Sequence, residues 1–70
     1  MDLYKPCPPK GSIVVAVGYE GAFQVIDVSP DGLTADIQPF DLVKRELFGS
    51  PINLPCSLLA VKTPPPNVRG

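Results

Sequence analysis

The fold is decided by residues 22–38, which read AFQVIDVSPDGLTADIQ. Two runs rich in apolar residues flank the segment 29–32 (SPDG), in which proline suits the second position of a β-turn and glycine tolerates a left-handed exit. Residues 33–38 alternate strictly, with Leu33, Ala35 and Ile37 on one face. The segment therefore predicts a β-hairpin whose second strand is half-buried.

The first strand of this hairpin, residues 22–28, has a less regular pattern. Phe23 and Val25 share one parity, whereas Ile26 and Val28 share the other. A β-bulge near Val25 or Ile26 would turn both sets toward the core. The alternative is a strand that is buried on both faces, with Asp27 or Gln24 against apolar neighbours. We favour the bulge, because it also bends a strand as a small closed barrel requires.

Further short strands are predicted on both sides of the hairpin. Residues 12–17 are dense in β-branched side chains and predict a strand with one face of large residues, Ile13, Val15 and Val17. A glycine-containing turn over 18–21 follows it. Residues 52–54 and 59–61 predict two more strands, and Pro55 to Leu58 predicts a single helical turn between them.

Residues 39–49 (PFDLVKRELFG) fit two structures equally well. In a short helix over 41–48, Asp41 would be the N-cap, Gly49 would follow the last turn, and Phe40, Val43 and Leu47 would share a face. In a long loop between strands, Pro39 interrupts the ladder and the charged run 44–46 is the solvated tip. The sequence leaves both alternatives open.

The prolines mark the limits of the domain. The chain of 70 residues holds ten Pro and six Gly, and six of the ten prolines lie before residue 11 or after residue 62. Because proline lacks the amide hydrogen that a sheet ladder needs, residues 1–10 are expected to be an extended head and residues 63–70 a Pro-rich tail. A single β domain is expected over 11–62.

Taken together, these elements resemble a small SH3-like barrel. The resemblance is carried by residues 11–14 (GSIV), the hairpin 23–37 and the closing segment 54–59 (LPCSLL), which is similar to the hydrophobic-Pro-turn-hydrophobic pattern before the last strand of SH3 domains. It implies an all-β fold, an SH3-like β-barrel of four to five short antiparallel strands. The chain also resembles short, uncharacterised bacterial open reading frames of mobile gene cassettes and phages, a likeness that implies no activity.

The family's proline-peptide surface does not carry over to this chain. The sequence contains no Trp, and it lacks the tyrosine-rich opening motif of eukaryotic SH3 domains. The resemblance therefore implies an architecture and no binding specificity.

Charge and hydropathy exclude several classes of function. The net charge is −1, and the only adjacent basic pair, Lys44-Arg45, is followed by Glu46. Binding to nucleic acid or to an acidic membrane surface is not expected, because both depend on clustered cations. The longest apolar run, residues 13–17, is far shorter than a membrane helix. The first residues show no secretory signal, so we expect a cytoplasmic location.

The residues that carry most enzyme chemistry are few. There is no His and there are two cysteines, which excludes a four-ligand zinc site within one chain and His-based nucleophilic catalysis. Without a secretory signal we expect Cys7 and Cys56 to be reduced rather than joined, although a disulfide is conceivable. Cys56 is expected to be a small buried hydrophobe.

Four carboxylates, on Asp27, Asp31, Asp36 and Asp41, lie within 15 residues of each other. Two of them could approach across the hairpin and act as an acid–base pair. We prefer structural roles, because Asp31 suits the turn, Asp41 suits a cap, and the other two are outward-facing strand residues. We predict no catalytic, cofactor-binding or metal-binding residues, and therefore no enzyme and no cofactor.

The most promising functional feature is apolar surface. Large apolar side chains crowd residues 40–48 of a domain too small to bury all of them. They either cap the open end of the barrel or form a surface for a partner. The candidate partner surface comprises Tyr19, Phe40, Leu42, Leu47 and Phe48.

From this surface we predict a small binding or adaptor protein that acts through protein–protein contact or self-association. The alternative is an oligomeric small-ligand binder or enzyme whose site forms only at a subunit interface. A protein partner or self-association into a homo-oligomer is expected, because a chain this small often needs oligomerisation or another source of stability.

Overall fold

The computed structural model describes residues 7–63, and these residues build an all-β fold from six short antiparallel strands in one open sheet. The strands are β1 (Ile13–Ala16), β2 (Ala22–Val28), β3 (Thr34–Asp41), β4 (Glu46–Leu47), β5 (Ile52–Pro55) and β6 (Leu59–Thr63), with the 3-10 turn η1 (Cys56–Leu58) between β5 and β6. The predicted all-β class is confirmed, with six strands in place of four or five. The predicted single turn at 55–58 is also confirmed.

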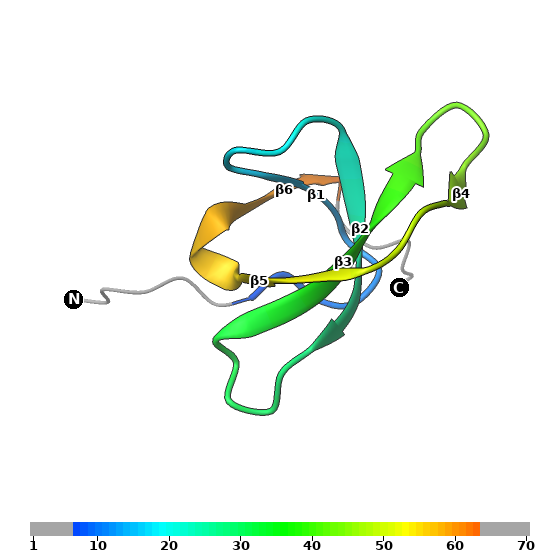
Figure 1. Ribbon diagram of the computed structural model, residues 1–70. Coiled ribbons are helices and arrows are strands. Elements are labelled where there is room, and N and C mark those ends of the chain that lie inside the picture. Colours follow the sequence, from blue (N-terminus) through cyan, green and yellow to red (C-terminus); the bar gives the residue numbers. More distant parts are fainter. Residues whose placement is uncertain (1–6, 64–70) are drawn as a thin grey trace.

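The strands are arranged as a meander that returns to its beginning (Figure 1). Neighbouring strands pair in the order β4-β3-β2-β1-β6, and β5 also pairs with β3. Since β2 occupies one edge of β3, the strands β4 and β5 follow each other along its other edge. After η1 the chain crosses to β6, which pairs with β1. The first and last strands of the described chain are thus neighbours.

The core lies on one side of this curved sheet. It is formed by nine buried side chains from β1, β2, β3, β5, η1 and β6: Val14, Ala16, Phe23, Val25, Ala35, Ile37, Leu54, Cys56 and Leu59. In β1 the inward face is the one with smaller side chains, and Val15 and Val17 of the large face are 39% and 70% exposed. Ile13 is nevertheless buried, because the pairing with β6 shifts register between Ile13 and Val14.

The predicted bulge in β2 is confirmed. Val25 pairs with Ile37 and Asp27 pairs with Asp36, so Ile26 is the extra residue in the β2–β3 ladder. Val25 before the bulge is buried, and Val28 after it packs against the core although the two positions differ in parity. One inserted residue therefore keeps the apolar side chains of both halves of β2 on the core side.

Residues 41–48 form a hairpin, not a helix. Phe40 pairs with Leu47 and Asp41 pairs with Glu46 across the end of β3 and β4. The Asp41 carboxylate accepts hydrogen bonds from the backbone N–H groups of Val43 and Lys44 at 2.9 and 3.0 Å. Asp41 therefore does cap backbone N–H groups, as a helix N-cap would. The capped N–H groups belong to the turn of a hairpin, however, and the chain then pairs as a strand instead of continuing as a helix. The loop alternative is correct for the charged tip, but Pro39 does not interrupt the ladder, because it lies within β3 and pairs with Phe23.

A disulfide joins Cys7, ahead of β1, to Cys56 in η1, and the expectation of reduced thiols is wrong in this structure. The two Cα atoms lie 5.1 Å apart although the residues are 49 positions apart in sequence. Cys7 Sγ also lies 3.1 Å from the carbonyl oxygen of Gly32. A half-cystine has no proton to donate, so this is a polar contact in the oxidised protein. Cys56 is buried, as expected.

Parts of the predicted head and tail lie outside the described residues. This applies to 1–6 of the head and 64–70 of the tail. Within the head, Pro8 is buried, and the Ser12 N–H donates to the carbonyl of Pro9 at 3.1 Å. Between residues 7 and 63 there is no helix with the length and hydropathy to span a membrane.

Candidate functional site

The β3–β4 hairpin carries the exposed apolar side chains that the sequence singled out. Leu42 is 48% exposed, Leu47 is 40% and Phe48 is 54%, while Phe40 is half-buried. Val43 at the tip is 92% exposed. These residues do not close the core, because the core side chains lie on other parts of the sheet. The hairpin therefore does not cap the hydrophobic core.

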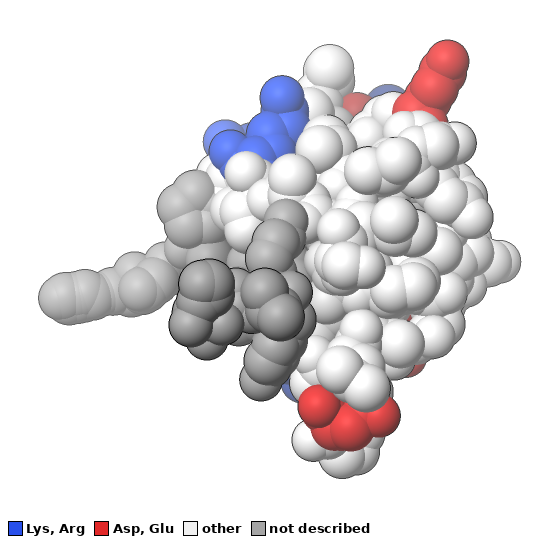
Figure 2. Space-filling model, turned by 90° about the vertical axis from the view of Figure 1, so that its left-hand side faces the viewer, with Lys and Arg blue, Asp and Glu red and all other residues white. Residues whose placement is uncertain are grey.

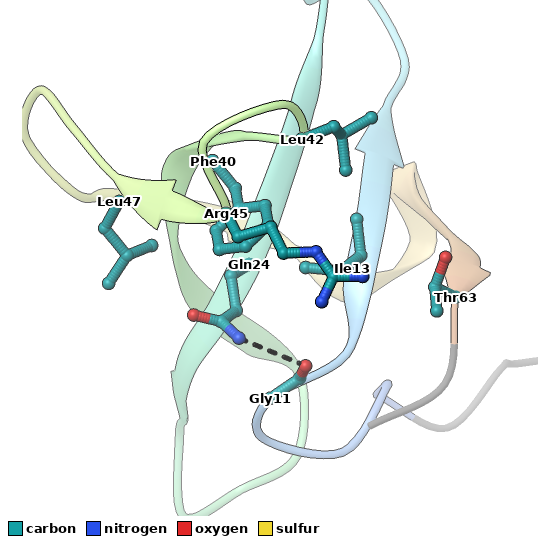
Figure 3. A pocket seen from close by; sticks show the side chains of 8 residues that line it. All are labelled: Gly11, Ile13, Gln24, Phe40, Leu42, Arg45, Leu47 and Thr63. Atoms are coloured by element: carbon teal, nitrogen blue, oxygen red, sulfur yellow. Dashed lines mark hydrogen bonds between the residues drawn. The ribbon is translucent and has the colours of Figure 1, made fainter. Parts of the chain in front are cut away.

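An open groove of about 660 Å³ lies beside this hairpin (Figure 3). Three of the predicted surface residues line it, namely Phe40, Leu42 and Leu47. Its other lining residues come from before β1, from β1 and β2, from the hairpin tip and from the end of β6: Gly11, Ile13, Gln24, Arg45 and Thr63. The topology explains this assembly, since β1 lies between β2 and β6.

The polar side of the groove is held by one hydrogen bond. Gln24 projects from β2, and its Nε2 donates to the carbonyl oxygen of Gly11 at 3.3 Å (Figure 3). The chain at Gly11 is fixed in turn, because its N–H donates to the carbonyl of Val25 at 2.9 Å. Gly11 has a φ of 90°, which an L side chain rarely adopts. The wall of the groove at this end is therefore built from backbone.

Arg45 is the charged residue of the groove and has an unusual backbone. Its φ is 59°, and it is the one non-glycine residue between 7 and 63 with a left-handed conformation. Its N–H donates to the carbonyl of Asp41 at 2.6 Å, which closes the hairpin turn. Glycine is the usual residue at such a position, and another residue costs roughly 1–2 kcal/mol there. The turn therefore has an arginine at a position where glycine would make the folded protein more stable.

The Arg45 side chain extends over the groove. It reaches from the hairpin over the groove, and its guanidinium group projects toward the side of Ile13 (Figure 3). Among residues 7–63, no carboxylate pairs with this guanidinium group and no acceptor holds it. An arginine presents a planar set of donors that suits a carboxylate. The groove thus combines apolar walls with one cation that is unpaired within the described part of the chain.

Tyr19 and Phe48, the other two predicted surface residues, do not line the groove. Tyr19 lies in the loop between β1 and β2 and packs edge to face on Phe23, with ring centroids 6.3 Å apart and planes at 90°. Phe48 follows β4, where its N–H donates to the carbonyl of Pro39 at 3.0 Å. The predicted surface is therefore divided, and three of its five members belong to one site.

The acidic residues have structural partners. The turn carboxylate of Asp31 accepts from the Ser29 hydroxyl and from the Leu33 N–H, and these two hydrogen bonds lower its pKa below 3.8. Asp36 accepts from Asn53 Nδ2 at 2.8 Å. It pairs with Asp27 in the β2–β3 ladder, and the Asp27 carboxylate accepts from the N–H of Val28 at 3.0 Å.

Neither member of the Asp27 and Asp36 pair lines the groove. No group of three or more His, Cys, Asp or Glu side chains within residues 7–63 could hold a metal ion. The structural roles proposed for Asp31 and Asp41 agree with their hydrogen bonds.

One face of the molecule has little charge. It lies on the side of η1, to the left in Figure 1, and the acidic and basic side chains in view lie at its margins (Figure 2). Several apolar residues of β1, the following loop and β6 are exposed elsewhere than in the groove, namely Val15, Val17, Tyr19 and Val61. The groove differs from these residues in having both apolar and charged lining.

Sequence reasoning missed five of the eight lining residues. Gly11, Ile13, Gln24 and Thr63 come from segments that only the folded sheet brings beside the hairpin. Arg45 was assigned to a solvated charged run. A signal for it existed, because the last loop residue of a short hairpin often needs a left-handed conformation and here is not glycine.

Known proteins give no further guide to the groove. The chain matches no protein-family model, no curated protein and no solved structure.

Proposed function

We propose that this protein is a small non-enzymatic binding or adaptor protein, and that the groove beside the β3–β4 hairpin is its contact surface. The observation that carries the proposal is the pair of exposed leucines, Leu42 and Leu47, on the wall of a groove of about 660 Å³. Exposed apolar side chains that gather at one site typically mark a surface for a partner. The partner is a protein or a second copy of the chain.

The same proposal includes the architecture. We propose that the sheet is an SH3-like barrel, a fold in which a hydrophobic-Pro-turn-hydrophobic segment precedes the last strand. The support is the passage from β5 through η1 into β6, and the pairing of β6 with β1. In such a barrel the meander carries its loops at the two ends, and the groove lies at the end of the β3–β4 hairpin.

A second candidate function follows from the volume of the groove. Small-molecule sites commonly measure about 300–1,000 Å³, and a groove of about 660 Å³ falls within that range. In an oligomer a neighbouring subunit could cover the open side and complete a ligand site. This alternative, an oligomeric ligand binder or enzyme, needs the subunit contact to come first.

The test compares two leucines in similar turns. Leu42→Asp alters the groove, whereas Leu33→Asp alters a leucine that is 59% exposed beside the β2–β3 turn and outside the groove. Both variants keep the core intact. We would measure self-association by light scattering over a wide concentration range, and binding of peptides by selection from a random library displayed on phage.

The expected result is that the wild-type protein associates or enriches peptides, that Leu42→Asp loses this property and that Leu33→Asp keeps it. A strict monomer that enriches no peptide would overturn the proposal. Self-association together with stabilisation by small molecules, seen in a thermal-shift screen, would favour the alternative.

A further inference from the structure

The chemistry of the groove is specific enough to name the kind of partner, provided that the proposed function holds. Four of its lining residues are apolar, namely Ile13, Phe40, Leu42 and Leu47, and one is an arginine. The remaining three, Gly11, Gln24 and Thr63, supply polar groups at the far side (Figure 3). A matching ligand must bring apolar side chains and an acceptor for the guanidinium group.

Arg45 has two features that a solvated loop arginine does not need. Its backbone is left-handed, with a φ of 59°, where glycine would avoid the conformational cost. Its side chain lies over an apolar groove without a hydrogen-bonded partner among residues 7–63. Backbone conformations of this kind gather at ligand sites, where the side chain is required for another reason.

The charges near the groove favour an anionic ligand. Lys10 is exposed and directly precedes the lining residue Gly11, on the side away from the hairpin, whereas Lys62 precedes Thr63 in β6 and therefore lies on the opposite face of that strand. The nearby acids belong to the hairpin itself. Of these, the Asp41 carboxylate already accepts from two backbone N–H groups of the turn, and Glu46 is exposed beside Arg45. A carboxylate on the ligand would meet Arg45 from the open side.

The shape of the groove favours a peptide over a small molecule. Leu42 and Leu47 form part of its wall and are still 48% and 40% exposed, so the site is shallow beside the hairpin. Pockets for small molecules usually enclose most of the ligand surface. An extended chain, by contrast, can lie in a shallow groove and direct alternate side chains into it.

We propose that the groove binds an extended apolar peptide segment that carries a carboxylate, and that Arg45 pairs with this carboxylate. The apolar walls supply contact area, and the guanidinium group selects for the acidic side chain. Because the pair is exposed to solvent, its contribution to affinity is modest and decreases as salt is added.

The experiment uses two pools of fluorescein-labelled peptides with random Val, Leu, Ile and Phe positions. One pool carries Glu at its central position, and the other carries Gln, which has nearly the same shape without the charge. Binding is measured by fluorescence anisotropy on wild-type protein, on Arg45→Gly and on the control Lys44→Ala. Lys44 neighbours Arg45 in the same charged run but does not line the groove.

We expect the wild-type protein to bind the Glu pool about 1.5-fold to fivefold more tightly than the Gln pool. Arg45→Gly should bind both pools equally, and its thermal midpoint should rise, because glycine relieves the left-handed backbone. Lys44→Ala should keep the preference. A shift of the Arg45 Nε–H resonance should accompany titration with the Glu pool and not with the Gln pool.

Failure of this inference is distinguishable from failure of the proposed function. If both pools bind equally and Leu42→Asp weakens both, the groove is a peptide site and the role of Arg45 is refuted. A preference for Glu that survives in Arg45→Gly also refutes it. If neither pool binds, the peptide partner is refuted, and self-association then decides whether the proposed function stands.

Discussion

Breaking the disulfide between Cys7 and Cys56 should remove a large part of the stability of this protein. The bond attaches the segment ahead of β1 to η1, and η1 leads directly into the strand that pairs with β1. Cys56 is 2% exposed and belongs to the core cluster, whereas Cys7 is half-buried against it. The disulfide therefore restricts the unfolded chain across most of its length.

The size of the effect follows from the sequence separation of 49 residues. A closed loop of about 50 residues lowers the entropy of the unfolded chain by an amount worth about 4 kcal/mol at 25 °C. A domain of 70 residues has a total free energy of unfolding of about 4–10 kcal/mol. The thermal midpoint should fall by roughly 15–30 °C when the bond is opened.

The assay is thermal unfolding followed by circular dichroism, with and without a phosphine reductant. Cys7→Ser is the matched variant, because it removes the bond while it leaves the buried Cys56 in place. It should melt like the reduced wild-type protein, and added reductant should not change it further. The prediction would be refuted if the wild-type melt were the same in both buffers and iodoacetamide labelled both cysteines when the untreated protein was unfolded in denaturant without reductant.

Three further predictions concern single polar residues. Ser12→Ala should be neutral or raise the free energy of unfolding by up to about 1 kcal/mol in urea titrations, because the buried Ser12 Oγ has no hydrogen-bond partner among residues 7–63 and its removal relieves a desolvation cost; a clear loss of stability would contradict this. The pKa of Asp31 is lowered chiefly by the Ser29 hydroxyl, so its stabilising contribution is complete above pH 3.8 and is lost as the pH falls through the lower native value. Melts of Asp31→Asn and wild type should accordingly differ at neutral pH and converge in acid, and a constant difference would exclude the carboxylate as the cause. Asp27→Lys should raise the free energy of unfolding by about 0.2–1 kcal/mol, because Asp27 faces Asp36 across the ladder; a decrease would show that the two carboxylates do not repel each other.

Local patterns in the sequence predicted most of the strands. Strict alternation over 33–38 placed Leu33, Ala35 and Ile37 on one face; Ala35 and Ile37 are in the core, but Leu33 precedes β3 and is 59% exposed. The conflict of parity in β2 predicted the bulge that the structure contains. The sequence also predicted the helical turn before β6, since Pro55 can begin such a turn, in which its missing N–H is not needed. Each of these features depends on a few residues that are adjacent in the chain.

Features that depend on distant residues could not be predicted in the same way. The carboxylate of Asp41 suits a helix cap and a hairpin turn equally, and only the pairing of Phe40 with Leu47 decides between them. The disulfide requires Cys7 to meet η1, which no local pattern encodes. The groove likewise needs Ile13 and Gln24 beside the hairpin, so three of its residues were predicted and the rest followed from the fold.

The disulfide also determines what happens when the backbone is cut. Val43 and the following basic residues form an exposed hairpin tip, where trypsin can cleave after Lys44 or Arg45. Both sites lie between Cys7 and Cys56, so the two fragments stay covalently linked after cleavage. A nicked molecule would keep its β2–β3 and β1–β6 ladders and migrate as one chain until it is reduced. The groove-side turn is therefore the place where this small fold could be opened, extended or joined to another protein without coming apart.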